Sequence, residues 1–264
     1  AGTDRNHAAG GLMGKAVGMR EYLVKLECGF YFHLLDIDEQ LLYKRIGAAV
    51  TTKIETLSAG YSDKNVFRKV CTALRYDNPE FFYWDAETSS ITGDSIILKY
   101  RFDDLQEILS VKQRLREIRR SIEETCLSES EYSTEKCLGM MYRFLVDNVK
   151  YAYEELQKPE RTKWIYDLEG CLVKKRAVCL GIAQAVQYIC RRLGIESILV
   201  TGMAELNGCK VNHAWNLVKI EEGFRHIDAT CGICEKKDGY QYFLMRDEDI
   251  SERNWRKDIY PSAR

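Results

Sequence analysis

Three strand-like runs follow one another in the last third of the chain, with only short turns between them. They are residues 195–203, 211–220 and 224–230, joined by Asn207–Gly208 and by Glu221–Glu222–Gly223. Turns of this length connect antiparallel neighbours, so the region is restricted to an antiparallel sheet. An apolar stripe at helical spacing precedes the sheet from Cys179 to Leu193, and Gly194 follows, where helices often end. One helix leading into an antiparallel sheet predicts an α+β fold.

The front half of the chain has mainly helical patterns. Apolar residues recur at helical spacing in residues 33–58, 66–74, 103–124 and 134–149. Phe81–Trp84 and Ser95–Phe102 instead have strand composition, and Thr92–Gly93–Asp94 between them predicts a β-hairpin. No apolar run of the sequence approaches the roughly 18 residues that a membrane-spanning helix needs.

We expect three segments along the chain. Residues 1–18 are rich in Gly and Ala and are interpreted as an expression leader ahead of a natural start at Met19. Residues 19–127 are expected to form a mainly helical N-terminal region, and residues 128–264 a core domain with a C-terminal tail. The polar joint at residues 128–133 sets this boundary. No Pro- or Gly-rich linker marks it, so we expect the front region to be an accessory layer rather than an independent module.

Charge and cysteine content restrict the partners and the compartment. The 39 basic and 40 acidic residues give a net charge of -1, which provides no electrostatic footprint for nucleic acid or an anionic membrane. The 10 cysteines are scattered through a chain long enough to bury its own core, which favours reduced thiols in the cytoplasm. Their even number keeps a secreted alternative open, with a signal peptide already removed.

One cysteine, one histidine and one aspartate have the positions that amide chemistry by a thiol requires. Such chemistry needs a thiolate, a base that creates it, and a group that orients the base. Cys179 begins the predicted helix, where the helix dipole and free backbone N–H groups favour a thiolate and can hold an oxyanion. His213 and Asp228 lie on the second and third predicted strands.

The pairing of the last two strands is expected to place His213 and Asp228 on one face of the sheet. A two-residue turn at Glu221–Glu222 puts His213 opposite Thr230, with Asp228 two residues along the same strand. Diagonal neighbours of this kind lie roughly 7–8 Å apart at the backbone, within reach of a hydrogen bond between the side chains. A shift of one residue in the pairing would put the two on opposite faces.

A longer stretch surrounds these residues. It reads AVCLGIAQAVQYICRRLGI and then VTGMAELNGCKVNHAWNLVKIEEGFRHIDATCG. The stretch resembles the transglutaminase-like superfamily of cysteine enzymes, in which a cysteine followed closely by glycine opens the core helix. In that family a HAWN-type strand supplies the base and a vDaT-type strand supplies the acid. The matching positions are Cys179 with Gly181, His213 to Asn216, and Asp228 with Thr230, in the family's order and at its spacing.

The resemblance implies a transglutaminase-core, papain-like α+β domain whose nucleophile helix packs on an antiparallel sheet. It implies a triad with Cys179 as nucleophile, His213 as base and Asp228 as the residue that orients the histidine. The implied reaction is an acyl-enzyme step on an amide of a peptide or protein, in a bacterial-type peptidase, deamidase or acyl transferase. No cofactor and no metal are expected. The family also includes inactive members, so a non-catalytic binding scaffold on the same fold is the alternative.

The surroundings of the triad match the family less closely. Ala177 stands where the family often has glycine, so the resemblance does not fix the shape of the loop before the nucleophile. We assign Gly181 and Trp215 to substrate binding, with the indole beside His213 walling the thiol from water. A plain core tryptophan is an equal alternative for Trp215.

Cys231 and Cys234 form a CGIC pair with three interpretations. A zinc site would need two more ligands, of which Cys209 and His213 are the nearest in sequence, and a redox pair would need both sulfurs to be adjacent and accessible. We interpret the pair as two structural thiols. His226 shares a strand face with the aspartate of the triad, which allows three interpretations: it lines the cleft, competes for that carboxylate or is a structural histidine. No EF-hand spacing is present, so the calcium requirement of animal transglutaminases does not carry over.

Overall fold

The computed structural model describes most of the chain. The described residues are 25–60, 63–128, 133–158, 162–206, 209–235, 240–250 and 252–264. The expected leader at residues 1–18 and the turn at Asn207–Gly208 lie outside the described residues. None of the helices in the described ranges is long and apolar enough to cross a membrane.

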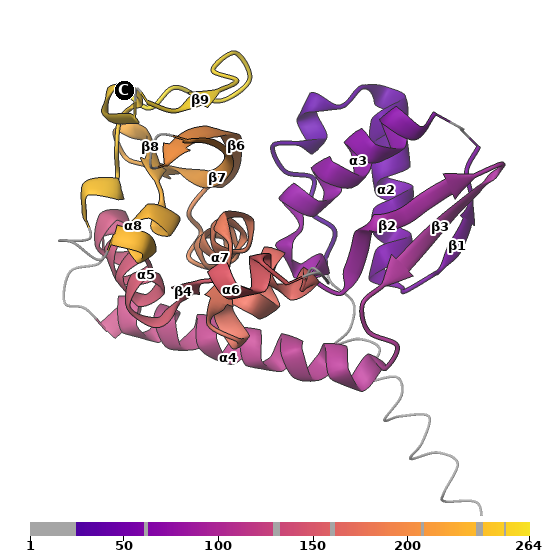
Figure 1. The fold of residues 1–264 in the computed structure, drawn as a ribbon, viewed down its shortest axis with the longest axis horizontal. Coiled ribbons are helices and arrows are strands. Elements are labelled where there is room, and N and C mark those ends of the chain that lie inside the picture. The colour runs from indigo at the N-terminus through magenta and orange to yellow at the C-terminus, as the bar shows by residue number, and fades with distance from the viewer. Residues whose placement is uncertain are drawn as a thin grey trace, which may run out of the picture. The chain divides into compact units, whose positions relative to one another are not determined.

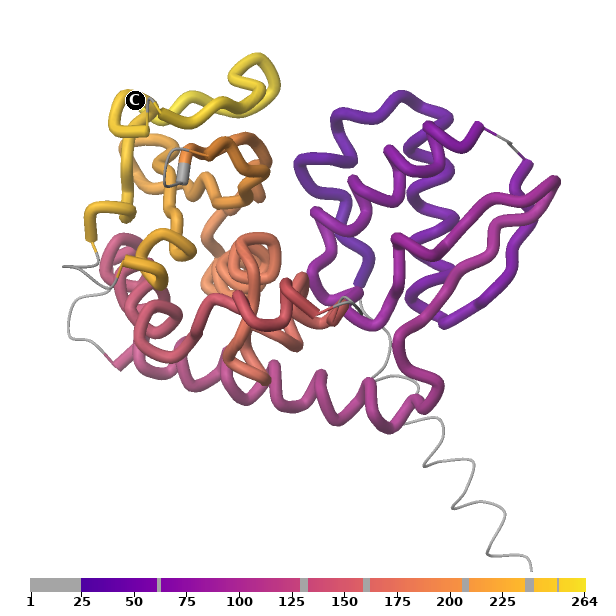
Figure 2. The backbone as a smooth tube through the Cα atoms, in the orientation of Figure 1, coloured from indigo at the N-terminus to yellow at the C-terminus, as the bar shows by residue number. Residues whose placement is uncertain are grey.

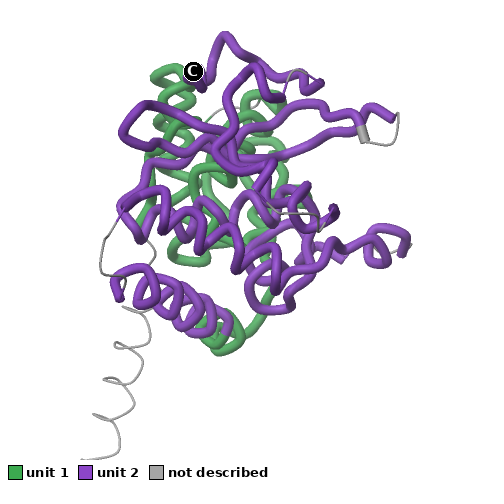
Figure 3. Tube along the Cα trace, turned by 90° about the vertical axis from the view of Figure 1, so that its left-hand side faces the viewer, with its two compact units in different colours: residues 1–110 green, residues 111–264 purple. Residues whose placement is uncertain are grey.

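The chain divides into two compact units, residues 1–110 and residues 111–264 (Figure 3). The division falls near the start of helix α4 (Leu105–Ser128), and the boundary expected between residues 127 and 128 lies at the end of that helix. That expectation rests on the polar joint at residues 128–133, which begins at the end of α4, a single continuous amphipathic helix. Most of α4 is therefore grouped with the second unit.

Unit 1 combines two helices with a small antiparallel sheet. The helices are α2 (Ile37–Thr51) and α3 (Lys64–Asp77), with short 3-10 turns η1 (Phe32–Leu34) and η2 (Pro79–Phe81). The strands are β1 (Thr56–Ser58), β2 (Trp84–Thr92) and β3 (Ser95–Tyr100), in the order β1-β3-β2 (Figure 1). Both helices begin at an aspartate whose carboxylate accepts N–H groups of the first turn, Asp36 in α2 and Asp63 in α3.

The predicted hairpin is present in unit 1, but its first strand begins later than expected. Pro79 opens a 3-10 turn that ends at Phe81, and β2 begins only at Trp84. Residues 81–83 are aromatic and buried, so their composition is typical of a strand while they pack as a turn. Gly93 has a φ of 56° between β2 and β3, in agreement with the predicted turn.

Unit 2 is an α+β arrangement with a four-stranded sheet. After α4 its helical elements are α5 (Thr134–Asn148), α6 (Tyr153–Leu156), η3 (Lys163–Tyr166), the π-helical η4 (Glu169–Val173), α7 (Cys179–Arg192), α8 (Ala229–Glu235), η5 (Tyr240–Tyr242) and η6 (Asp247–Ile250). The sheet contains β6 (Ser197–Leu206), β7 (Cys209–Ile220), β8 (Gly223–Ile227) and β9 (Asn254–Trp255), in the order β8-β7-β6-β9 with antiparallel pairing. A separate parallel pair joins β4 (Lys150–Tyr151) to β5 (Arg176–Ala177).

Helix α7 packs on this sheet, mainly against β7 and β6 (Figure 1). Its apolar stripe, which includes Ile182, Val186 and Ile189, is fully buried. Burial of each such side chain contributes about 1.5–3 kcal/mol, so packing fixes the helix and the position of its first residue. The helix ends before Gly194, whose φ of 71° agrees with the predicted stop signal.

The register between β7 and β8 agrees with the predicted two-residue turn, because Ile220 pairs with Gly223. The third strand was predicted to reach residue 230, and this is wrong, since β8 ends at Ile227 and α8 begins at Ala229. His213 therefore has no strand partner at residue 230. The reason is local: Asp228 accepts a hydrogen bond from the backbone N–H of Cys231 through Oδ1 at 3.0 Å, which is how an aspartate caps a helix.

The C-terminal segment returns to the far edge of the same sheet. Figure 2 shows the last part of the chain running back beside β6, where Gly202 pairs with Trp255 on β9. Gly202 also pairs with His213 on the other side, so this glycine lies between β9 and the strand of the histidine. A Cβ at Gly202 would clash with the carbonyl oxygen of Asn254, which leaves no room for a side chain.

We expect Gly202→Ala to lower the stability of the protein by about 1–3 kcal/mol, because β9 must move away from β6 to admit the methyl group. The measurement is the free energy of unfolding in urea. Gly139→Ala is the matched control: its Cβ would meet nothing closer than 3.7 Å, and alanine is the better helix former. Equal stability of the two variants would contradict the close packing of β9 on β6.

Candidate active site

Cys179 is the first residue of α7 and is partly exposed. The preceding residue, Val178, has extended backbone and no side-chain cap, so the N–H groups of the first turn are not covered by a capping side chain. The backbone N–H of Val178 donates to Ile165 at 2.9 Å and fixes the loop before the helix. Gly181 allows a close approach there, since a Cβ at this residue would lie 2.7 Å from the carbonyl oxygen of Ile165. The neighbours of Gly181 are therefore backbone atoms of η3 and of Asp167, which follows it.

His213 on β7 and Asp228 at the end of β8 form a buried pair. Nε2 of His213 lies 2.6 Å from Oδ2 of Asp228, and the two side chains are 2% and 0% exposed. Burial lowers the pKa of His213, but the charge of Asp228, the hydrogen bond with Asp228 and the interactions with Cys179 and Cys231 outweigh it, so the pKa is raised. The imidazole is therefore held in a site that stabilises its protonated form.

Of the three residues of the expected triad, His213 and Asp228 lie in direct contact, and Cys179 lies near the imidazole. Cys179 lies near enough to the imidazole of His213 for their interaction to raise the pKa of the histidine. Because Nε2 already faces Asp228, Nδ1 is the nitrogen left for the thiol. A thiol at a helix N-terminus, a base and an orienting carboxylate have the relative order that nucleophilic catalysis by cysteine requires.

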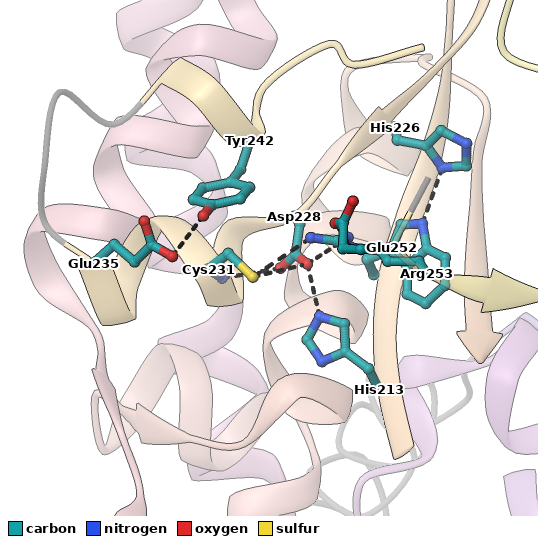
Figure 4. Close-up of polar contacts among 9 residues, drawn as sticks. His213, His226, Asp228, Cys231, Glu235, Tyr242, Glu252 and Arg253 are labelled. Atoms are coloured by element: carbon teal, nitrogen blue, oxygen red, sulfur yellow. Dashed lines mark hydrogen bonds and ion pairs between the residues drawn. The ribbon is translucent and has the colours of Figure 1, made fainter. Parts of the chain in front are cut away.

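Two groups that the sequence analysis did not assign to the site also contact Asp228 (Figure 4). Nη1 of Arg253 lies 2.7 Å from Oδ2 as an ion pair without hydrogen-bond geometry, and the arginine side chain is 2% exposed. The Sγ of Cys231 lies 3.3 Å from the same oxygen. Burial raises the pKa of Asp228, but the charge and hydrogen bond of His213, the charge of Arg253 and the N–H of Cys231 lower it well below its usual range.

The CGIC pair is divided between two environments. Cys231 is buried beside Asp228, whereas Cys234 is exposed and its Sγ lies 3.4 Å from the hydroxyl of Tyr153. Sequence signals could have placed Cys231, because an aspartate three residues earlier is a common helix cap. Arg253 has no comparable signal, since it reaches Asp228 only through the pairing of β9 with β6.

A metal site of the kind considered from the sequence does not fit these residues. In the described part of the chain, His213, Asp228 and Cys231 are grouped closely enough to hold an ion, and Cys209 and Cys234 are not part of that group. Arg253 already places a positive charge on the carboxylate oxygen that a metal would use. A second cation would be repelled there, so we assign no metal to this group.

Trp215 separates His213 from a second histidine. Its indole stacks on the ring of His213 at 5.7 Å between centroids and donates from Nε1 to Nδ1 of His226 at 2.9 Å. Nε2 of His226 lies 2.8 Å from Oδ1 of Asp247, so His226 does not compete for Asp228. Trp215 is 1% exposed, and its ring also contacts Trp255 and Arg253.

Tyr151 on β4 lies near the thiol and was not singled out from the sequence. Burial raises the pKa of its phenol, and the charge of Cys179 raises it further. Its ring packs against Tyr153 at 4.5 Å. Two basic residues before the nucleophile form ion pairs: Lys174 with Glu169, and Arg176 with Glu155.

Asn216, the last residue of the HAWN motif, connects the base strand to the nucleophile helix. Its Nδ2 donates to the carbonyl oxygen of Ala183 in α7 at 3.0 Å, and the residue is buried. This hydrogen bond fixes the position of α7 along β7. The distance between Cys179 and His213 depends on that position.

We expect Asn216→Ala to reduce stability by about 1–2 kcal/mol and to slow alkylation of Cys179 roughly tenfold, since the helix is no longer fixed on the strand. Urea unfolding and peptide mapping after iodoacetamide treatment measure the two effects. Asn148→Ala is the control, because Asn148 makes the same amide-to-carbonyl bond at an exposed position. Unchanged alkylation in Asn216→Ala would show that the bond does not position the thiol.

Comparison with known families identifies one matching family model. Residues 120–229 match the family model of the transglutaminase-like superfamily. The chain therefore contains a transglutaminase-like core domain, and the matched segment includes Cys179, His213 and Asp228. Arg253 and Cys231 lie beyond it.

Three solved structures are similar to parts of the chain. They are a candidate cysteine protease from Cytophaga hutchinsonii, a transglutaminase, and a candidate protease from Parabacteroides distasonis. Their sequence identities are 19%, 14% and 11%, and their TM-scores are 0.35, 0.40 and 0.32. The alignments cover 44%, 54% and 53% of this chain but only 37%, 44% and 30% of those chains. Comparison with curated proteins gave no match.

Proposed function

We propose that this protein is a cysteine enzyme that acts on amide bonds of peptides or proteins through an acyl-enzyme. Cys179 is the nucleophile, His213 the base and Asp228 the residue that orients His213. The observation that supports this most is a buried imidazole whose Nε2 lies 2.6 Å from a buried carboxylate, near a thiol at a helix N-terminus.

In the proposed reaction, Nδ1 of His213 takes the thiol proton, and the thiolate of Cys179 attacks the amide carbonyl carbon. The oxyanion that forms is held by backbone N–H groups in the first turn of α7. The imidazolium then gives its proton to the leaving amine as the C–N bond breaks, which leaves a thioester on Cys179. In the second half, neutral His213 removes a proton from the acceptor, a water molecule or an amine, which attacks the thioester and releases the thiol.

The test is selective labelling. We expect iodoacetamide at neutral pH to alkylate Cys179 faster than Cys209, which is exposed and serves as a standard in the same molecule. Peptide mapping by mass spectrometry gives both rates. His213→Ala should slow the labelling of Cys179 and leave that of Cys209 unchanged, because only the first thiol has the histidine as its base.

The alternative is a binding scaffold that uses the same fold without chemistry. In that case Cys179 would be alkylated no faster than Cys209, and His213→Ala would change neither rate. Peptidases, deamidases and acyl transferases share the acyl-enzyme step and differ in the acceptor. Mass analysis of a glutamine-containing peptide, incubated with and without a primary amine, separates these three outcomes.

A further inference from the structure

Arg253 supplies a buried positive charge to the site. Its guanidinium lies 2.7 Å from Oδ2 of Asp228, the same oxygen that His213 approaches to 2.6 Å. It also contacts the Sγ of Cys231 at 3.5 Å and lies over the Trp215 ring at 5.3 Å. The side chain is 2% exposed, although it comes from a segment beyond the family match.

The ionisable groups around His213 and Asp228 determine the charge balance of these two residues. Asp228, Cys179 and Cys231 face His213, and Cys234 and Tyr142 lie near enough to interact electrostatically with the pair. Arg253 pairs with Asp228 and also lies 3.5 Å from Glu252, whose side chain is half exposed. Arg253 also disfavours the charged form of His226. Among the described residues that these interactions involve, Arg253 is the one whose positive charge is permanent.

The buried carboxylate of Asp228 needs a countercharge at every stage of a reaction cycle. While His213 is protonated, the imidazolium provides one. When His213 gives up its proton, a fully buried carboxylate without a partner would be costly, and the imidazole would retain its proton. The ion pair with Arg253 compensates the carboxylate in that second state.

We propose that Arg253 is a positioning residue that acts through Asp228, holding the carboxylate ionised and in place while His213 loses and regains a proton. This inference rests on the proposed function. Arg253 does not touch the reacting atoms. Its charge offsets part of the stabilisation that Asp228 gives to the imidazolium, which favours transfer of the proton to a leaving amine and return of the neutral imidazole as the base for the acceptor.

The sign of the effect follows from the charges. Arg253 is a cation near His213, so its removal stabilises the imidazolium and raises the pKa of His213 by about one unit or more. Deacylation needs the neutral imidazole, which is present above that pKa. The pH midpoint of deacylation should therefore rise by about the same amount. At a fixed pH below the midpoint, the deacylation rate should fall roughly tenfold for each unit by which the pKa rises.

The experiment uses p-nitrophenyl acetate as the acyl donor, since p-nitrophenolate leaves without being protonated. The full-length protein is acetylated, excess ester is removed, and loss of the acetyl group from the Cys179 peptide is followed by mass spectrometry between pH 5 and 10. Arg253→Met should shift the midpoint upward. Arg253→Lys keeps the charge, so its midpoint should lie close to that of the unmodified protein. Arg225→Met is the control, because its guanidinium bonds to the carbonyl of Phe224.

An unchanged midpoint in Arg253→Met would overturn the inference. Failure of the proposed function has a different signature: Cys179 would not be acetylated in the protein with arginine, methionine or lysine at residue 253. A measurement that needs no activity completes the test. Arg253→Met should lower the melting temperature when Asp228 is present and should not lower it in Asp228→Asn. Equal losses in both backgrounds would show that Arg253 does not act through Asp228.

Discussion

Cys179→Ala is expected to abolish acyl-enzyme formation, with turnover falling on the order of 10⁶-fold. The alanine variant keeps the helix, the base and the oxyanion donors but has no atom that can form the thioester. Because Cys179 is partly exposed at the start of α7, the loss of its sulfur leaves little cavity, and the melting temperature should change little. Intact-mass detection of the acetyl adduct measures the first effect, and thermal unfolding measures the second.

The control for this variant is Cys234→Ala. Cys234 is exposed and lies near enough to His213 for their charges to interact, yet it is not hydrogen-bonded to the imidazole in the described structure. Its removal should leave acetylation of Cys179 at the normal rate. A Cys179→Ala protein that still forms a stable acyl adduct elsewhere in the site, for example on Cys231, would show that the nucleophile has been assigned to the wrong thiol.

Asp228→Asn is expected to slow turnover about 10⁴-fold, because an amide cannot stabilise the imidazolium and favours the wrong tautomer of His213. The fall should appear in kcat. The variant is also expected to lose stability, because the loss of the carboxylate leaves Arg253 buried without its ion-pair partner. We expect a destabilisation of about 3–5 kcal/mol, measured by urea unfolding.

The two effects of Asp228→Asn can be separated. Activity is measured at a temperature where the variant is still folded, and per folded molecule it should remain low. Adding Arg253→Met removes the unpaired cation and should recover stability without recovering activity. Normal activity in the folded fraction of Asp228→Asn would assign the aspartate to the fold alone.

Local signals were enough to predict the helix–sheet arrangement around the site. The two-residue turn at Glu221–Glu222 fixes the register of β7 and β8, and that register carries His213 toward Asp228. The stop of α7 at Gly194 is equally local. In each case the determining residues lie within a few positions of the feature that they control.

The features that sequence analysis missed depend on competing or distant interactions. The run after β8 has strand composition, but the cap formed by Asp228 turns the backbone into α8. Arg253 is brought to Asp228 by the pairing of Gly202 with Trp255, a contact between segments far apart in sequence. No periodicity or motif around residue 253 reports a partner of that kind.

The distance along the chain between Asp228 and Arg253 also has a consequence for how the protein folds. The β7–β8 hairpin involves neighbouring segments and can form early, whereas β9 must close a long loop before it reaches β6. Until β9 docks, the carboxylate of Asp228 has no permanent countercharge and is stable only in contact with water. We therefore expect docking of β9 and burial of Asp228 to occur in one late, cooperative step, so that a partly folded chain exposes a wet and unassembled site.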